Sequence, residues 1–127
     1  MATSINIDAF YFWNRVAALV KPFPGVEEGT SYGTAAFKVR GKMFVRLKEN
    51  GRWIVVYTDE RDKWMKANPA IFFITDHYLN YPAMLIDLET VKDSDLLTLL
   101  TASWRLRAPA AMLRQWDALV KKPRKKR

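Results

Sequence analysis

The sequence predicts a two-layer α+β domain in which helices pack against one antiparallel sheet of about five strands. Two observations lead to this fold class. Residues 34–57 form three short runs of alternating apolar and polar residues separated by glycine-containing turns, which is the pattern of an antiparallel meander. Other segments repeat apolar residues every three or four positions, as amphipathic helices do. The expected order is therefore helix, three strands, helix, two strands and helix.

The first helix is expected over residues 7–21, where an apolar stripe recurs at helical spacing. The stripe consists of Ile7, Phe10, Trp13, Ala17 and Val20. Pro22 and Pro24 end this helix, because proline lacks an amide proton and disfavours helix at the residue before it. Residues 26–33 are expected to form a short extended segment.

Three strands are expected next, over residues 34–40, 43–48 and 52–57. Gly41-Lys42 is expected to form the first turn, because glycine adopts positive φ without steric cost. Asn50-Gly51 is expected to form the second turn, since Asn-Gly is the strongest short-range signal of a hairpin. Strands joined by such short turns pair with each other in antiparallel fashion.

The second half of the chain continues with both kinds of element. We expect a helix over 59–68, strands over 70–75 and 83–89, and helices over about 94–107 and 110–120. Pro69 closes the first of these helices, and Pro109 separates the last two. This order leaves the helices on one face of the sheet.

Length and composition indicate one domain over residues 1–120, followed by a basic, flexible tail over 121–127. Half of the 127 residues are apolar, which excludes a disordered chain. The chain has no Cys, which excludes disulfides, thiol catalysis and Cys-ligated metals. No stretch is apolar enough to span a membrane and the N-terminus lacks the pattern of a signal peptide, so a cytoplasmic location is expected.

The formal net charge of +8 is concentrated in two short segments. Residues 121–127 carry six basic residues and no acid, and residues 38–52 carry six basic residues and one acid. The remaining residues carry nine bases and twelve acids, so the body of the domain is mildly acidic. This distribution favours nucleic acid, anionic lipid or an acidic protein as the class of partner.

The segment 38–52 is the first candidate site, a nucleic-acid-binding surface. If Phe37 and Val39 face the core, strand alternation turns the neighbouring cations outward, together with Phe44 on the partner strand. Gathered like charges destabilise strand pairing unless an anion lies nearby, and an exposed Phe can stack on bases or wedge between them. The candidate residues are Lys38, Arg40, Lys42, Phe44, Arg46, Lys48 and Arg52. The alternative is a solvated sheet face whose charges prevent edge pairing.

The tail is a candidate for non-specific polyanion contact, because basic runs bind phosphates through counterion release. Its basic residues are Lys121, Lys122, Arg124, Lys125, Lys126 and Arg127. A nuclear-localisation patch and a solubilising end are the alternatives. Pro123 and repulsion among the like charges argue against a helix in this segment.

Residues 76–82 form a polar and aromatic loop, which is the second candidate site. Its possible ligand-binding residues are Asp76, His77, Tyr78 and Tyr81. His77 is the only histidine of the chain, so neither a His-centred metal site nor a serine triad is expected. His77 is expected to hold the loop by a structural hydrogen bond, and the alternative is a partly buried contact residue. We predict no catalytic residue, metal or cofactor, and we do not expect an enzyme.

Several motifs together resemble one known family. They are Pro24–Glu28, Tyr32-Gly33, Phe37–Phe44, Phe72–Tyr78, Tyr81-Pro82, Ser103–Arg105 and Ala108-Pro109. This combination resembles the MmcQ/YjbR-like family over about residues 8–113, which is nearly the whole domain. The resemblance implies a compact α+β fold similar to the CyaY-like and secretion-chaperone-like folds. It also implies DNA binding through a double-wing surface, although fold alone does not fix function.

The expected function is therefore non-enzymatic binding of DNA, or of nucleic acid in general, through the basic strand hairpin. One alternative is a protein-interaction or chaperone-like module, and another is a small-ligand site in the 76–82 loop. DNA is the expected partner, no membrane contact is expected, and the chain is expected to be a monomer or a weak homodimer.

Overall fold

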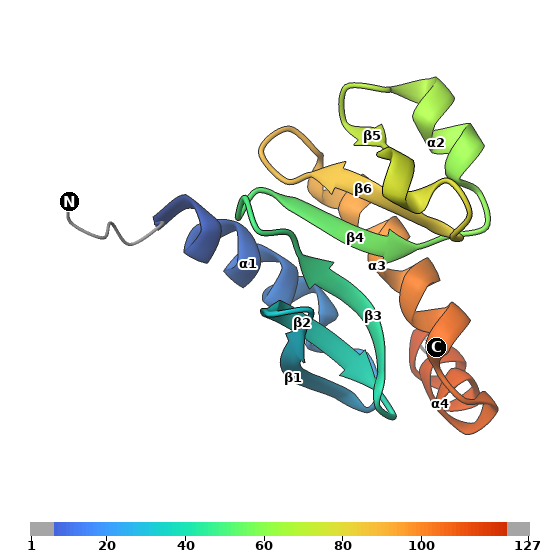
Figure 1. The fold of residues 1–127 in the computed structure, drawn as a ribbon. Helices are drawn as coiled ribbons and strands as arrows, with labels where there is room; N and C mark the ends of the chain where they lie inside the picture. The colour runs from blue at the N-terminus through green and yellow to red at the C-terminus, as the bar shows by residue number, and fades with distance from the viewer. Residues whose placement is uncertain (1–6, 122–127) are drawn as a thin grey trace.

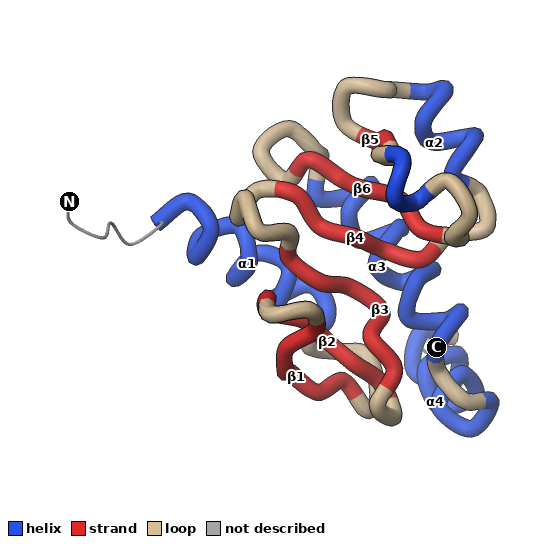
Figure 2. Tube along the Cα trace, in the orientation of Figure 1, coloured by secondary structure: helices blue, strands red, loops and turns tan. Residues whose placement is uncertain are grey.

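Six antiparallel strands form a single sheet in the computed structural model, which describes residues 7–121. Their order across the sheet is β1-β2-β3-β4-β6-β5 (Figures 1 and 2). Their bounds are β1 (Val26–Ser31), β2 (Thr34–Val39), β3 (Lys42–Leu47), β4 (Trp53–Tyr57), β5 (Phe72–Phe73) and β6 (Ala83–Asp87). The predicted α+β class is confirmed, with one strand more than expected because β1 pairs with β2 along its whole length.

The four α-helices of the described part of the chain pack on one face of this sheet, and a short 3-10 helix lies on the other. They are α1 (Ile7–Val20), α2 (Arg61–Ala67), α3 (Asp93–Arg107) and α4 (Ala110–Val120), with a short 3-10 helix η1 (Asp76–Tyr78). Figure 1 shows α1 and α3 passing behind the sheet, with α4 following at the end of α3. None of the helices within residues 7–121 is both long enough and apolar enough to cross a membrane.

The main hydrophobic core lies between the sheet and helices α1 and α3. Val16 and Val20 of α1 and Leu100 and Trp104 of α3 are fully buried in it. Trp13 stacks on Phe37 of β2, with ring centroids 4.8 Å apart. Trp13, Ala17 and Val20 of the predicted stripe therefore pack against the sheet, whereas Phe10 is 68% exposed and the side chain of Ile7 lies outside the described part of the chain.

The face of the sheet opposite α1 and α3, here called the outer face, carries a second and smaller apolar cluster. Tyr78 of η1 packs there with Val55 of β4 and with Ala83 and Leu85 of β6. The 76–82 loop therefore folds back over β4 and β6. Figure 2 shows the short helix η1, in blue, in front of β6.

Two tight turns shape the meander of β1, β2 and β3. Strand pairing leaves two residues in each turn. Tyr32 and Gly33 have φ angles of 51° and 82°, and Arg40 and Gly41 have φ angles of 52° and 80°. Positive φ at both central residues is the pattern of a type I′ turn. The turn predicted at Gly41-Lys42 is thus displaced by one residue, and Arg40 lies at the turn rather than on a strand face.

A β-bulge in β3 changes the direction of its side chains. Phe37 pairs with Val45 and Lys38 pairs with Met43, so Phe44 is an extra residue between them. Phe44 and Val45 are both fully buried in the main core. The prediction that Phe44 faces outward to contact bases is therefore wrong, because strict alternation requires a regular ladder. Met43, the residue before Phe44 on β3, lies on the outer face.

The bulge also ends the direct pairing of β3 with β4. The last register pair on this side joins Val45 to Val56. Beyond it, the buried hydroxyl of Ser103 accepts a hydrogen bond from the Tyr57 amide (2.9 Å) and donates one to the Phe44 carbonyl (2.5 Å). One side chain of α3 thus replaces a backbone bond between the two strands, which diverge past it (Figure 1).

Candidate functional site

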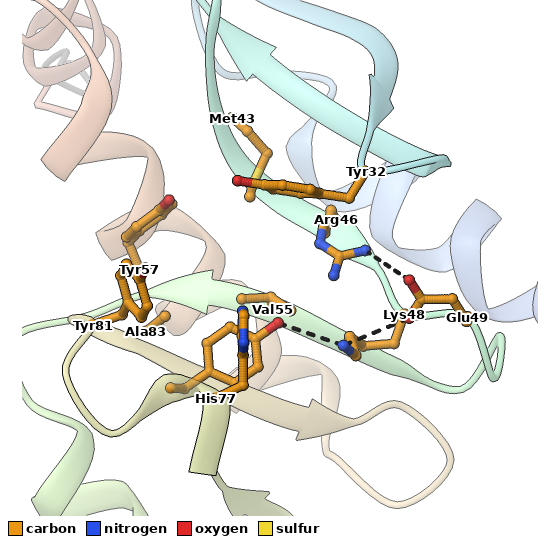
Figure 3. Close-up of a pocket in the computed structure, with 11 residues that line it drawn as sticks. Tyr32, Met43, Arg46, Lys48, Glu49, Val55, Tyr57, His77, Tyr81 and Ala83 are labelled. Atoms are coloured by element: carbon orange, nitrogen blue, oxygen red, sulfur yellow. Dashed lines mark hydrogen bonds and ion pairs between the residues drawn. The ribbon is translucent and has the colours of Figure 1, made fainter. Parts of the chain in front are cut away.

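A cavity of about 380 Å³ opens on the outer face where β3 and β4 diverge (Figure 3). The turn after β1 and strand β3 form one side of it, and strand β4, the start of β6 and the 76–82 loop form the other. Its lining residues are Tyr32, Met43, Arg46, Lys48, Glu49, Val55, Tyr57, His77, Tyr78, Tyr81 and Ala83. The cavity therefore joins residues from both candidate sites predicted from the sequence.

Arg46 is the most buried cation of the cavity, with only 6% of its surface exposed. Its Nη1 donates to Thr34 Oγ1 at 2.8 Å and lies 3.7 Å from a Glu49 carboxylate oxygen. The guanidinium also lies over the ring of Tyr32, 5.2 Å from the ring centroid. A buried charge needs compensation, and here the carboxylate that supplies it stands at a long distance.

Lys48 provides the second cation of the cavity. Its Nζ lies 3.5 Å from the hydroxyl of Tyr78 and 3.5 Å from the other carboxylate oxygen of Glu49. A backbone hydrogen bond and the neighbouring Lys48 and Arg46 charges hold the pKa of Glu49 below its ordinary value. Two cations thus share one exposed carboxylate, and the cavity carries a net positive charge at neutral pH.

Aromatic rings form most of the remaining wall. His77 stacks on Tyr81 with an interplanar angle of 27° and lies edge-on to Tyr78. Tyr57 is backed by the guanidinium of Arg107, which lies 4.4 Å from its ring centroid. Tyr32 is 83% exposed at the tip of its turn. Rings at these positions can stack on a flat ligand, and the cations can neutralise an anionic one.

Arg61 of α2 holds the 76–82 loop in place. Its guanidinium donates hydrogen bonds to four backbone carbonyls, those of Tyr78, Leu79, Tyr81 and Ala83, at 2.6–3.0 Å. His77, predicted to hold the loop by a hydrogen bond, makes ring contacts instead. The loop is therefore positioned by a guanidinium that matches several carbonyls at once, which sequence reasoning did not find.

The cations predicted as one nucleic-acid surface separate into three places. Arg46 and Lys48 lie in the cavity, whereas Arg40 and Lys42 are exposed at the β2–β3 turn. Within residues 7–121, neither Arg40 nor Lys42 takes part in an ion pair. Lys38 lies between the two groups, opposite Met43 on one side and Glu27 on the other.

Arg52 lies outside this arrangement. It makes two hydrogen bonds to Asp87, at 2.9 and 3.0 Å, and an ion pair with Glu89 at 3.1 Å. The Arg52 hydrogen bond is the main reason that the pKa of Asp87 is lowered, with a backbone hydrogen bond from Glu89 adding to it. Acidic partners thus occupy this guanidinium, so it cannot join the hairpin cations on one surface.

The remaining candidate residues divide between the fold and the tail. Asp76 begins η1 and does not line the cavity. Lys121 is exposed at the end of α4. The other tail residues, Lys122, Arg124, Lys125, Lys126 and Arg127, lie outside the described residues.

Several lining residues were missed from the sequence. Tyr32 could have been predicted, because the Tyr32-Gly33 pair before an alternating strand is typical of a tight turn. Such a turn places Tyr32 at the tip of a hairpin. Met43 and Tyr57 carry no such signal, since the bulge and the divergence of β3 and β4 turn them toward the cavity.

Fold and site define a two-layer α+β domain that has helices on one face of an antiparallel sheet and a cationic, aromatic cavity on the other. The chain belongs to the YjbR family, because the family model described as YjbR matches residues 21–106. This match confirms the resemblance inferred from the motifs, and it contains every residue that lines the cavity.

The curated relatives that match the chain are named as uncharacterized proteins. The uncharacterized proteins Mb2600 of Mycobacterium bovis and Rv2570 of Mycobacterium tuberculosis are 30% identical to it over 74 residues, which are 58% of this chain and 51% of theirs. The chain thus spans about half the length of the curated relatives it matches. The crystal structure of Deinococcus radiodurans protein DR2400, a DUF419 domain, matches with a TM-score of 0.65 and 18% identity, over 74% of this chain and 76% of that one. This last likeness concerns the fold alone.

Proposed function

We propose that this domain binds nucleic acid through the outer face of its sheet and catalyses no reaction. The observation that carries the proposal is a succession of cations leading from an exposed turn into an aromatic cavity. Arg40 and Lys42 stand at the turn, Lys38 follows on β2, and Arg46 and Lys48 lie inside the cavity. All five come before Arg52 in the sequence, and Arg52 itself is paired with Asp87.

Phosphate groups and bases together match this succession. Exposed cations attract the phosphate backbone whatever the base sequence, and each contact releases condensed counterions. Aromatic side chains add stacking, which tolerates any base because every base has a flat face. A surface that offers cations and aromatic rings side by side is therefore better suited to a polynucleotide than to a single small anion.

The test is a salt-titrated measurement of DNA binding by fluorescence anisotropy. Arg40→Ala/Lys42→Ala should weaken binding and lower the slope of log affinity against log salt by about 1.4–1.8, the value for two lost phosphate contacts. Lys66→Ala/Lys92→Ala is the matched control, because it removes two exposed cations elsewhere on the domain. An equal response of the two double variants would show that only net charge matters.

The tail requires its own variant, since a basic run binds any polyanion. In the full-length chain, the five basic residues of 122–127 are replaced by Gln. If binding disappears in this variant and persists in Arg40→Ala/Lys42→Ala, the contact belongs to the tail and the proposal for the folded domain fails.

A small-ligand function at the 76–82 loop is the second candidate, because that loop closes one side of a real cavity. It differs from the first in one measurable respect. A free small molecule would then bind without any polynucleotide, and the exposed cations at the β2–β3 turn would contribute nothing.

A further inference from the structure

We infer that the cavity on the outer face receives one unpaired nucleotide, with its phosphate at the cationic end and its base at the aromatic end. The inference deepens the function proposed above and rests on it. Figure 3 shows the two ends: Arg46, Lys48 and Glu49 lie together on one side, and Tyr57 and Tyr81 lie together on the other. A nucleotide has the same division into an anion and a flat ring.

The cationic end is incompletely neutralised. Glu49 approaches Arg46 at 3.7 Å and Lys48 at 3.5 Å, whereas charge-assisted hydrogen bonds measure about 2.7–2.9 Å. The side chain of Glu49 is 64% exposed, so it can swing into solvent without disturbing the core. A phosphate can therefore take its place between the two cations, and Glu49 acts as a loosely held competitor of the ligand.

The aromatic end is preorganised for a flat ring. His77 and Tyr81 already stand nearly parallel, with ring centroids 5.9 Å apart. Arg61 fixes the backbone that carries Tyr81, so the ring is presented from a held loop. A base entering the cavity would extend an existing stack, and little ordering of the protein would accompany its binding.

The size of the cavity excludes paired bases. Its volume of about 380 Å³ is near the lower end of the range of about 300–1,000 Å³ for small-molecule sites. A base within a duplex has both faces covered by its neighbours and would have to leave the stack to enter. The cavity therefore selects single strands over duplexes, while the turn cations serve both.

The test compares three probes on the full-length protein by calorimetry: a short oligothymidine, the same strand in a duplex, and free thymidine monophosphate. Tyr81→Ala removes one ring of the aromatic end, and His77→Ala removes the ring that stacks on it. Each should weaken single-strand binding about 5- to 100-fold and leave duplex binding unchanged. Tyr11→Ala, which removes an exposed ring on α1, is the matched control.

Glu49→Gln tests whether the Glu49 carboxylate competes with the ligand phosphate for Arg46 and Lys48, because this change removes the negative charge. It should strengthen single-strand binding about 2- to 5-fold, the value of a loose surface ion pair, whereas loss of fold would weaken it. Thermal melting of each variant by circular dichroism checks that the variants are folded. An unchanged single-strand affinity in Glu49→Gln, in Tyr81→Ala and in His77→Ala overturns the inference.

The outcomes separate this inference from the proposed function. Equal affinity for strand and duplex, with Arg40→Ala/Lys42→Ala still weakening both, overturns the inference and leaves nucleic-acid binding standing. Binding of thymidine monophosphate alone, lost in Tyr81→Ala, supports the nucleotide cavity and overturns the proposed polynucleotide function. Absence of binding by all three probes overturns both.

Discussion

Replacing Ser103 by Ala should destabilise the domain by about 3 kcal/mol, because one hydroxyl satisfies two buried backbone groups. In wild-type protein the Tyr57 amide donates to this hydroxyl, which in turn donates to the Phe44 carbonyl. Ser103→Ala leaves both groups without a partner in a place that is 0% exposed. Each buried group left unsatisfied costs about 1–3 kcal/mol.

Urea denaturation followed by tryptophan fluorescence measures this change, since the chain has five Trp residues. An effect of about 3 kcal/mol is a large part of the free energy of unfolding of about 5–15 kcal/mol typical of such domains. Thr98→Ala is the control: it deletes a hydroxyl of the same helix that bonds the Ser94 carbonyl at an exposed position. It should change the free energy of unfolding by less than about 0.5 kcal/mol.

A Ser103→Ala variant as stable as the control would refute this reasoning. It would mean that β3 and β4 close together and form the missing bond directly once the hydroxyl is gone. The cavity above them would then shrink, so a loss of its ligand binding without a loss of stability would identify that outcome.

Three further predictions concern other parts of the fold. Arg61→Lys should raise the rate of amide hydrogen exchange in residues 76–82 about 10- to 100-fold, because an ammonium group cannot donate to all four carbonyls at once. Hydrogen–deuterium exchange followed by mass spectrometry measures this rate. Arg52 lowers the folded-state pKa of Asp87 from its ordinary value of 3.8, so the stability from this pair is present above about pH 4 and is lost as the pH falls toward the folded-state pKa. Asp87→Asn should therefore flatten the acid side of a stability–pH profile obtained by urea denaturation. Gly25→Ala should lower the free energy of unfolding by about 1–2 kcal/mol, as measured by thermal unfolding. Gly25 has φ +72°, and a Cβ there would lie 2.5 Å from the side chain of Met112 on α4.

The sequence was sufficient to predict the meander because its signals are local. Asn50-Gly51 predicted a hairpin, and there Gly51 has φ 71° and the Lys48 amide donates to the Trp53 carbonyl at 2.8 Å. Strand β1 was described only as an extended segment, since Glu27 and its neighbours are polar. It lies at the sheet edge, where pairing with one neighbour uses the backbone and requires few apolar side chains.

The site was less predictable because it depends on contacts between distant segments. Both candidate regions, 38–52 and 76–82, were recognised, but they were treated as separate surfaces. They meet because η1 folds back over β4, which no local pattern indicates. The bulge at Phe44 likewise depends on how β2 and β3 pair, so alternation alone placed that ring on the wrong face.

The divergence of β3 from β4 also divides the sheet mechanically. Only three register pairs join these strands, whereas six join β1 to β2 and five join β4 to β6. The seam between β1–β3 and the other three strands runs beneath the cavity. A molecule bound to Arg46 on one half and to Tyr81 on the other would therefore bridge the two halves. Such a ligand resists the separation of the two halves at this seam, and its binding free energy adds directly to the thermal stability of the domain.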